Sequence, residues 1–184
     1  MKKLTLFTLI STALLALTPS QKSQALKIAN TASKAYLDYL EAEILKTLKN
    51  YSMEDALMFC KTKAYPLSMK FALQMSQKFH IKIKIKRISF KNRNNSNYPN
   101  ITDQPILKKL SKSQKPIVKE YGKMVVVYEP IKISNLCLLC HGTNINPQLH
   151  KIINKLYPND KAIGYKLGDF RGAVVITIEK KGLK

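Results

Sequence analysis

The chain has few acidic residues, few cysteines and no second long apolar run. Eleven Asp and Glu stand against 32 Lys and Arg, which gives the 184 residues a formal net charge of +21. After residue 17 no apolar stretch approaches the ~20 residues that cross a bilayer, and this excludes a protein with several membrane spans. Only three cysteines are present, without a second C-x-x-C or an H-x-x-x-H, which counts against the usual structural zinc modules.

The N-terminus is typical of an export signal. Met1-Lys2-Lys3 is a short basic segment, residues 4–17 are mostly apolar and uncharged, and Ser23-Gln24-Ala25 is a small-x-small cleavage site. We therefore predict a signal peptide at residues 1–25 and one domain at residues 26–184, with an uncleaved membrane anchor as the alternative. The mature protein is then expected in the periplasm, with no membrane-spanning segment after the signal is cut.

The excess of lysine and arginine persists beyond the signal. Such a balance suits nucleic acid or an anionic surface, but export argues against nucleic acid, and the lysines are scattered along the chain. A lysine-rich composition inherited from an AT-rich genome is the simpler explanation. The functional alternative is a basic surface that docks an acidic redox partner or lies near anionic lipid headgroups.

Hydrophobic periodicity predicts helices first and strands later. A helix-capping pattern at Tyr51-Ser52-Met53-Glu54-Asp55 has Ser52 as N-cap and Asp55 in the capping-box position. From His80 to Lys86 isoleucine alternates with a basic residue, so the isoleucines should face inward, and a change of phase at Lys86-Arg87 predicts a bulge. The expected helices are residues 26–49, 51–60, 67–78, 106–112 and 148–157, and the expected strands are 80–86, 118–128 and 173–178. This order predicts an α+β domain in which a long N-terminal helix precedes a small antiparallel sheet.

Cys137-Leu138-Leu139-Cys140-His141 is a C-x-x-C-H motif, the attachment site of a covalent c-type haem. The two thiols can add to the two vinyl groups of one porphyrin, and the adjacent imidazole becomes the proximal iron ligand. We predict one haem c on Cys137 and Cys140, with His141 on the iron. The alternatives are a zinc site that includes His150, and a thioredoxin-like redox pair.

The residues alone leave the sixth iron ligand open. Cys60 is the odd cysteine, and it fits a ligand, a reactive thiol, an intermolecular disulfide or a small buried side chain. Methionine and histidine compete with it on chemistry. The competing residues are Met58, Met69, Met75, Met124, His80 and His150.

Several segments share their pattern with one known family. Residues 56–64 fit A-x-x-x-C-x-x-x-A, residues 87–94 come close to R-x-S-x-K-x-R-N, and the likeness continues through residues 128–142, 156–165 and 168–173. The chain thereby resembles the PAS-like haem c proteins, typified by a cyanobacterial cytochrome with His/Cys axial ligation. The same domain also forms the periplasmic part of some sensor kinases.

The resemblance implies a PAS-like sheet flanked by helices. It also implies His141 as proximal ligand and the thiolate of Cys60 on the opposite face of the haem. Where the family tends to have Ala-Pro, this chain has Ala64-Tyr65-Pro66, and the extra residue is expected to affect the helix after Cys60.

Two functions are predicted for such an exported monohaem protein. The first is sensing of redox poise or of a diatomic gas, in which loss of the Cys60 bond moves its helix and a separate signalling partner responds. The alternative is electron transfer to an acidic redox partner. An enzyme is not expected, because no convincing distal acid–base residue for a peroxidase is found. Candidate contacts for the haem propionates, as opposed to an ordinary solvated basic face, are Arg87, Lys91, Arg93 and Arg171.

Overall fold

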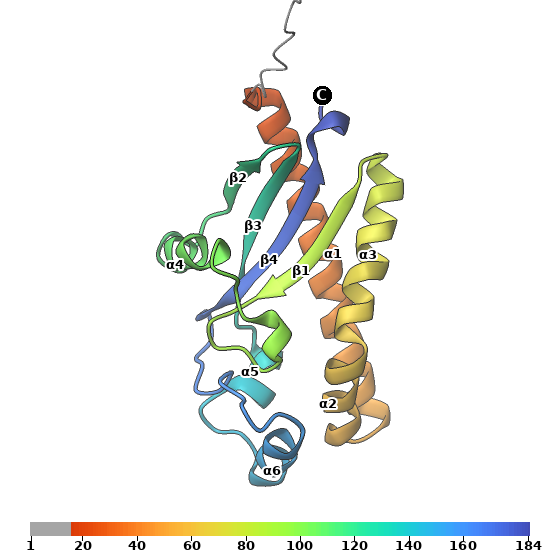
Figure 1. Ribbon diagram of the computed structural model, residues 1–184. Helices are drawn as coiled ribbons and strands as arrows, with labels where there is room; N and C mark the ends of the chain where they lie inside the picture. Colours follow the sequence, from red (N-terminus) through yellow and green to blue (C-terminus); the bar gives the residue numbers. More distant parts are fainter. Residues whose placement is uncertain (1–15) are drawn as a thin grey trace, which may run out of the picture.

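The structure is a computed structural model that describes residues 16–184 (Figure 1). Helices and strands follow in the order α1 (Pro19–Asn50), α2 (Met53–Thr62), α3 (Ala64–Phe79), β1 (Ile83–Ile88), η1 (Asn95–Asn97), α4 (Asp103–Ser113), β2 (Ile117–Tyr121), β3 (Met124–Lys132), α5 (Asn135–His141), α6 (Pro147–Leu156), β4 (Phe170–Glu179) and η2 (Lys180–Gly182). The predicted α+β class, with a long N-terminal helix and a small antiparallel sheet, is confirmed.

The four strands form one antiparallel sheet in the order β1-β4-β3-β2. The last strand of the chain therefore lies inside the sheet, between β1 and β3. Residues 173–176 and Ile178 of β4 are buried, which explains why this strand is almost wholly apolar and does not alternate. Both edges of the sheet, β1 and β2, carry exposed lysines, a common protection of edge strands.

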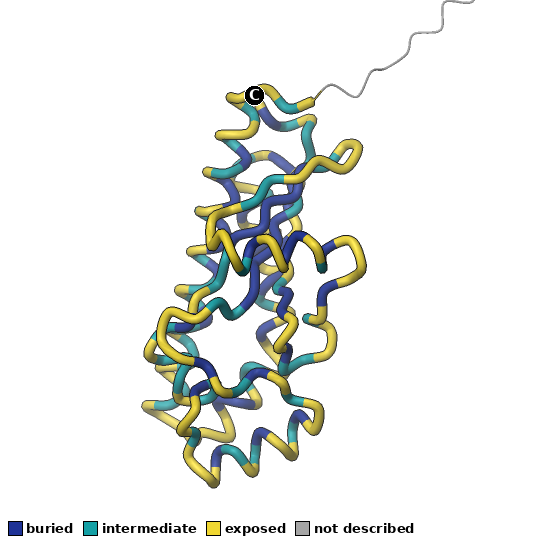
Figure 2. The backbone as a smooth tube through the Cα atoms, turned by 90° about the vertical axis from the view of Figure 1, so that its left-hand side faces the viewer, coloured by how far each residue is buried: buried dark blue, intermediate teal, exposed yellow. Residues whose placement is uncertain are grey.

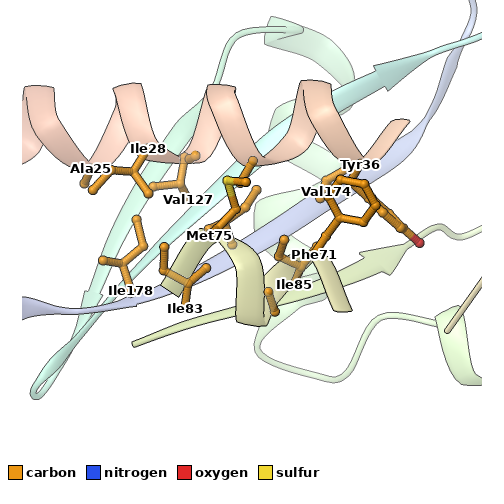
Figure 3. Close-up of a cluster of buried hydrophobic side chains, with 14 of the residues drawn as sticks. Ala25, Ile28, Tyr36, Phe71, Met75, Ile83, Ile85, Val127, Val174 and Ile178 are labelled. Atoms are coloured by element: carbon orange, nitrogen blue, oxygen red, sulfur yellow. The ribbon is translucent and has the colours of Figure 1, made fainter. Parts of the chain in front are cut away.

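The helices cover the two faces of the sheet unequally. α1 and α3 pack on one face, where side chains from both helices meet alternate residues of β1, β3 and β4 (Figure 3). This main cluster contains residues of α1, α3 and the sheet, for example Tyr36, Met75 and Val127. The shorter α4 covers the other face with Leu107 and Leu110, which are both fully buried. Figure 2 shows that the buried residues are concentrated where these layers stack.

Two details of the predicted strands were wrong. The expected strand 118–128 is a hairpin, because Gly122 turns the chain with φ +56° and Tyr121 pairs directly with Met124. The expected bulge at Lys86-Arg87 is also absent, since β1 keeps a regular register with β4. Ile88 instead faces the opposite side of the sheet from Ile85 and packs in the α4 cluster. The apparent change of phase in the sequence is thus a change in which face is apolar.

The helix boundaries bear out the capping pattern and revise other limits. Ser52 accepts from the backbone N–H of Asp55, and the Asp55 carboxylate accepts from the backbone N–H of Ser52, as the capping box predicts. Helix α3 begins at Ala64, three residues earlier than expected, and Pro66 lies in its first turn, where its missing N–H is tolerated.

The predicted export signal falls largely outside the described residues. From Pro19 onward its end forms the first turns of α1, where Ala25 is fully buried. Gln24 Oε1 accepts from the backbone N–H of Lys184 at 2.6 Å, so this part of α1 also contacts the C-terminus. The position of the cut stays a prediction. In residues 16–184 no helix is both long and apolar enough to span a bilayer.

One end of the sheet collects the remaining elements. β1 and β3 end there and β4 begins there, since Ile88 pairs with Ala173 and Ile131 with Gly172. The chain after β1, the helices α5 and α6, and the α2 end of the helical layer all gather around this end (Figure 1). Segments that lie far apart in the sequence are thereby brought together beside the C-x-x-C-H motif.

Candidate functional site

Helix α5 carries the whole C-x-x-C-H motif on two turns. Cys137 packs toward the small cluster of Ile133, Ala162 and Tyr165. Cys140 packs toward a different cluster, formed by α2 and α6. All three cysteines of the protein are free thiols, so both motif sulfurs are available for a covalent bond.

The start of α5 is tied to α1 through a hydroxyl group. Ser134 is the N-cap residue but makes no side-chain cap bond. Its hydroxyl instead donates to Glu41 Oε1 at 3.1 Å, and the same oxygen lies 3.2 Å from Cys137 Sγ. Because the hydroxyl hydrogen is used on Glu41, the Cys137 thiol is left to donate to Ser134. This chain of contacts orients the first thiol of the motif.

The imidazole of His141 is held by one ring nitrogen. Nδ1 lies 2.6 Å from the carbonyl oxygen of Ala162, and since a carbonyl can only accept, Nδ1 carries the hydrogen. Nε2 is then the nitrogen with a free lone pair, the tautomer required of a metal ligand. Burial, with Arg93 and Arg171 acting in the same direction, holds the pKa of His141 well below its usual value. The ring is therefore neutral.

Cys60 lies in the last turn of α2 and faces the motif across a cavity of about 250 Å³. Cys137, Cys140 and His141 line the same cavity. Burial raises the pKa of the Cys60 thiol, while the nearby Arg87 acts in the opposite direction. Tyr157, which the sequence analysis did not single out, also lines the cavity, and burial raises its pKa to about 12.

The other candidate sixth ligands do not share this cavity within the described part of the chain. His80 is the exposed C-cap of α3, at the opposite end of β1 from the motif. Met75 is buried in the main core, and Met124 begins β3 at the far end of the sheet. Met58 and Met69 are exposed on α2 and α3, and His150 lies on α6.

Two sets of contacts position α2, and thus Cys60, relative to α5. Leu57 of α2 is buried against Leu149 and Ile153 of α6, the cluster that Cys140 also joins. Just after α2, the hydroxyl of Tyr36 donates to the carbonyl oxygen of Ala64, the first residue of α3, at 3.0 Å. The Cys60 sulfur is therefore placed by packing between elements and not by the residues next to it in the chain.

Three of the four predicted basic contacts line the cavity. Arg171 Nη1 donates to Ser89 Oγ at 2.8 Å and to the Lys91 carbonyl at 2.9 Å, while Arg87 lies over the ring of Tyr36. Arg93 is paired with Asp160. Lys91 does not line the cavity: its Nζ donates to the Ile163 carbonyl and lies 4.3 Å from the centre of the Tyr165 ring. Arg87 and Arg171 thus remain as cavity-facing cations without a carboxylate in the described residues.

The zinc alternative finds no support in the geometry. Among residues 16–184 no three His, Cys, Asp or Glu side chains are grouped so that they could hold a metal ion.

Some residues at the site carry no signal that sequence reasoning could read as a role. Glu41 of α1 and the segment of Asp160 and Ala162 contact the motif residues or their partners from far away in the sequence, and Ser134 does so as the N-cap of α5. Asp160 belongs to the Pro158-Asn159-Asp160 turn, and a turn pattern gives no information about what its acid pairs with. Only the folded arrangement shows these contacts.

Comparison with known proteins places the chain in a family. A sequence model described as Tll0287-like matches residues 18–179, and the chain belongs to this family. One solved structure, "Crystal structure of the cyanobacterial heme-protein Tll0287", is similar with a TM-score of 0.58 and 19% identity, over 89% of this chain and 97% of that chain. At this identity the likeness shows the fold. No curated protein matches the chain.

Proposed function

We propose that this member of the Tll0287-like family is an exported protein that carries one covalent haem c. Cys137 and Cys140 would form the thioethers, and His141 and Cys60 would be the axial ligands. The observation that carries the proposal is that Cys60, from α2, lines one cavity with the C-x-x-C-H motif of α5. The solved relative is described as a heme-protein, which supports the same cofactor class.

The residues present fit this group chemically. Two free thiols and a neutral imidazole with a free Nε2 lie on one short helix, and a third thiol approaches from another element. Arg87 and Arg171 supply cations for two propionates. When bound, the haem supplies reversible one-electron chemistry whose potential depends on its axial ligands.

The position of Cys60 on a short helix with few buried residues favours a sensing role. Helix α2 is ten residues long and buries only Ala56 and Leu57. Elements with few buried contacts open or shift at low free-energy cost. A change in the bond to Cys60, caused by redox poise or by a diatomic gas, would therefore be transmitted to α2 and on to a separate signalling partner.

Electron transfer is the second candidate. The formal net charge of +21 suits docking to an acidic redox protein. Leu139, between the two motif cysteines, is also half exposed, so one side of α5 reaches the surface. A carrier would keep both axial ligands in both oxidation states. Both functions are binding roles without an enzymatic reaction, and both place the protein in the periplasm.

The first experiment expresses the protein together with a haem c maturation system. Intact mass after denaturation should show one covalently bound haem. The Cys137→Ala, Cys140→Ala double variant should lack this added mass. Absorption and low-temperature EPR spectra are then recorded for wild type and Cys60→Ala. A low-spin thiolate signature that disappears in the variant supports Cys60 as ligand, and Met58→Ala, an exposed change on the same helix, is the matched control.

Two further measurements separate the functions. Binding of CO or NO to the reduced wild type, with a change in the exchange of α2 amide hydrogens, supports sensing. Fast electron self-exchange with unchanged ligation supports the carrier. Wild-type protein without covalent haem contradicts both.

A further inference from the structure

A buried ion pair lies beside His141 and is not explained by haem attachment. Arg93 Nη2 lies 2.9 Å and Nε 3.1 Å from Asp160 Oδ2. The two side chains are only 8% and 4% exposed, and they are 67 residues apart in the sequence. The pair joins the loop after β1 to the turn after α6.

Both partners of the pair make second contacts that lead to the proximal histidine. Arg93 Nη2 also donates to the carbonyl oxygen of Cys140 at 2.6 Å, the residue directly before His141. The other carboxylate oxygen of Asp160 accepts from the backbone N–H of Ala162 at 2.8 Å. The carbonyl of that same Ala162 accepts from His141 Nδ1. The ion pair therefore contacts both partners of the His141 hydrogen bond: Arg93 holds helix α5, which carries His141, and Asp160 holds the loop that carries the Ala162 carbonyl.

Stability alone is a weak reason for such a pair. Desolvation of two buried charges offsets most of their attraction, and apolar replacements are often equally stable. A fixed orientation is what the pair supplies here. Asp160 Oδ2 accepts from both Nε and Nη2 of Arg93, while Oδ1 accepts from the Ala162 N–H, so both carboxylate oxygens are held. In metal sites, the partner of the second ring nitrogen sets the tautomer, the ring orientation and the basicity of the ligating nitrogen.

We infer that Arg93 and Asp160 are positioning residues, which hold the Ala162 carbonyl against His141 Nδ1 and would thereby tune the bond of Nε2 to a haem iron. The inference rests on the proposed haem function. It also gives Arg93 a different role from the one its sequence predicted. The arginine is committed to Asp160 and to the Cys140 carbonyl, so the propionates are left to Arg87 and Arg171.

Asp160→Asn tests the inference. The asparagine oxygen can still accept from the Ala162 N–H, but its amide group faces the Arg93 guanidinium without a charge to hold it. A looser Ala162 carbonyl weakens the hydrogen bond that it accepts from His141 Nδ1. Because Nε2 then gives less electron density to the iron, the ferric form is destabilised. We expect about a tenfold change in the ferric/ferrous equilibrium, which is a rise of about 59 mV for one electron, together with shifted EPR g values.

Asp103→Asn is the matched control. Asp103 forms the Lys86 ion pair with a side chain only 6% exposed and also accepts from the hydroxyl of Tyr128, remote from α5. The Asp103→Asn variant should be less stable than wild type but should keep the wild-type reduction potential and EPR spectrum. If Asp160→Asn loses comparable stability but keeps the wild-type potential and g values, the pair is purely structural and the inference fails.

A readout without haem keeps the inference testable by itself. The ring ¹⁵N shifts of His141 in the cofactor-free protein report which nitrogen carries the hydrogen. Nδ1–H is expected to dominate in wild type and to lose part of its population to Nε2–H in Asp160→Asn. If Asp160→Asn does not fold, Arg93→Lys, which keeps the charge but loses the fork, takes its place in both measurements. Absence of covalent haem from wild type would refute the proposed function, whereas an unchanged tautomer population in the variant would refute the positioning role.

Discussion

Glu129 is a buried carboxyl group whose replacement by glutamine should stabilise the protein, and increasingly so as the pH rises. It lies in β3 opposite Val174 of β4, and its side chain shares a face with Val127, which packs toward α1. The residue is 6% exposed, and its Oε1 has no hydrogen-bond partner. Burial raises the pKa of this carboxyl above its ordinary value of 4.5.

The sign of the effect follows from proton binding in the two states. Between pH 4.5 and the raised pKa, the unfolded chain loses the Glu129 proton while the folded protein keeps it. The free energy of unfolding therefore falls as the pH rises, by up to about 1.4 kcal/mol for each unit of pKa shift. Glutamine has nearly the same shape and does not titrate. The variant should match wild type near pH 4 and gain on it until the pH passes the folded pKa, after which the difference stays constant.

Urea unfolding of the cofactor-free protein at intervals between about pH 4 and pH 7.5 measures this difference. Glu54→Gln, an exposed change in the first turn of α2, is the control and should show at most a few tenths of a kcal/mol at any pH. A gap between Glu129→Gln and wild type that is constant from pH 4 to pH 7.5 would refute the reasoning. It would show that the folded protein binds no extra proton at Glu129.

Three further predictions concern stability. Ile153→Ala, in the fully buried contact between α6 and α2, should lower the free energy of unfolding by about 2–5 kcal/mol and Ile153→Val by about 0.5–1.5; equal losses in urea unfolding would contradict the packing. Gly172→Ala should lower the Tm more than Gly122→Ala, because a Cβ at Gly172 would overlap the Ile88 carbonyl oxygen whereas Gly122 borders open space. A chain that starts at Leu26 should be at least ~1 kcal/mol less stable than one that starts at Leu17, since it lacks the N-terminal cap of α1 and the buried Ala25; calorimetry checks this, and no difference would show that these turns add nothing.

Local patterns in the sequence predicted local structure well. The Ser52/Asp55 capping box, the inward isoleucines of β1 and the long first helix depend on residues a few positions apart, and short-range rules are sufficient for these features. The errors arose where local patterns have two meanings. Ile88 reads as a bulge or as a change of apolar face, and only the packing of α4 against the second face of the sheet decides between them.

The chemistry proposed for the C-x-x-C-H motif is predicted by the sequence alone, because two thiols and an imidazole lie within five residues of one another. The opposite side of the site is not. Six methionines and histidines were as suitable as Cys60 by residue type. Cys60 shares a cavity with His141 only because α2 packs on α6 and the sheet brings α5 to the same end.

The packing of distant elements also explains why Arg93 pairs with Asp160 and why Lys91 does not line the cavity. Charges in loops pair according to where the ends of β1, β3 and β4 place those loops. This is a property of strand order and register, which no short segment of the sequence specifies.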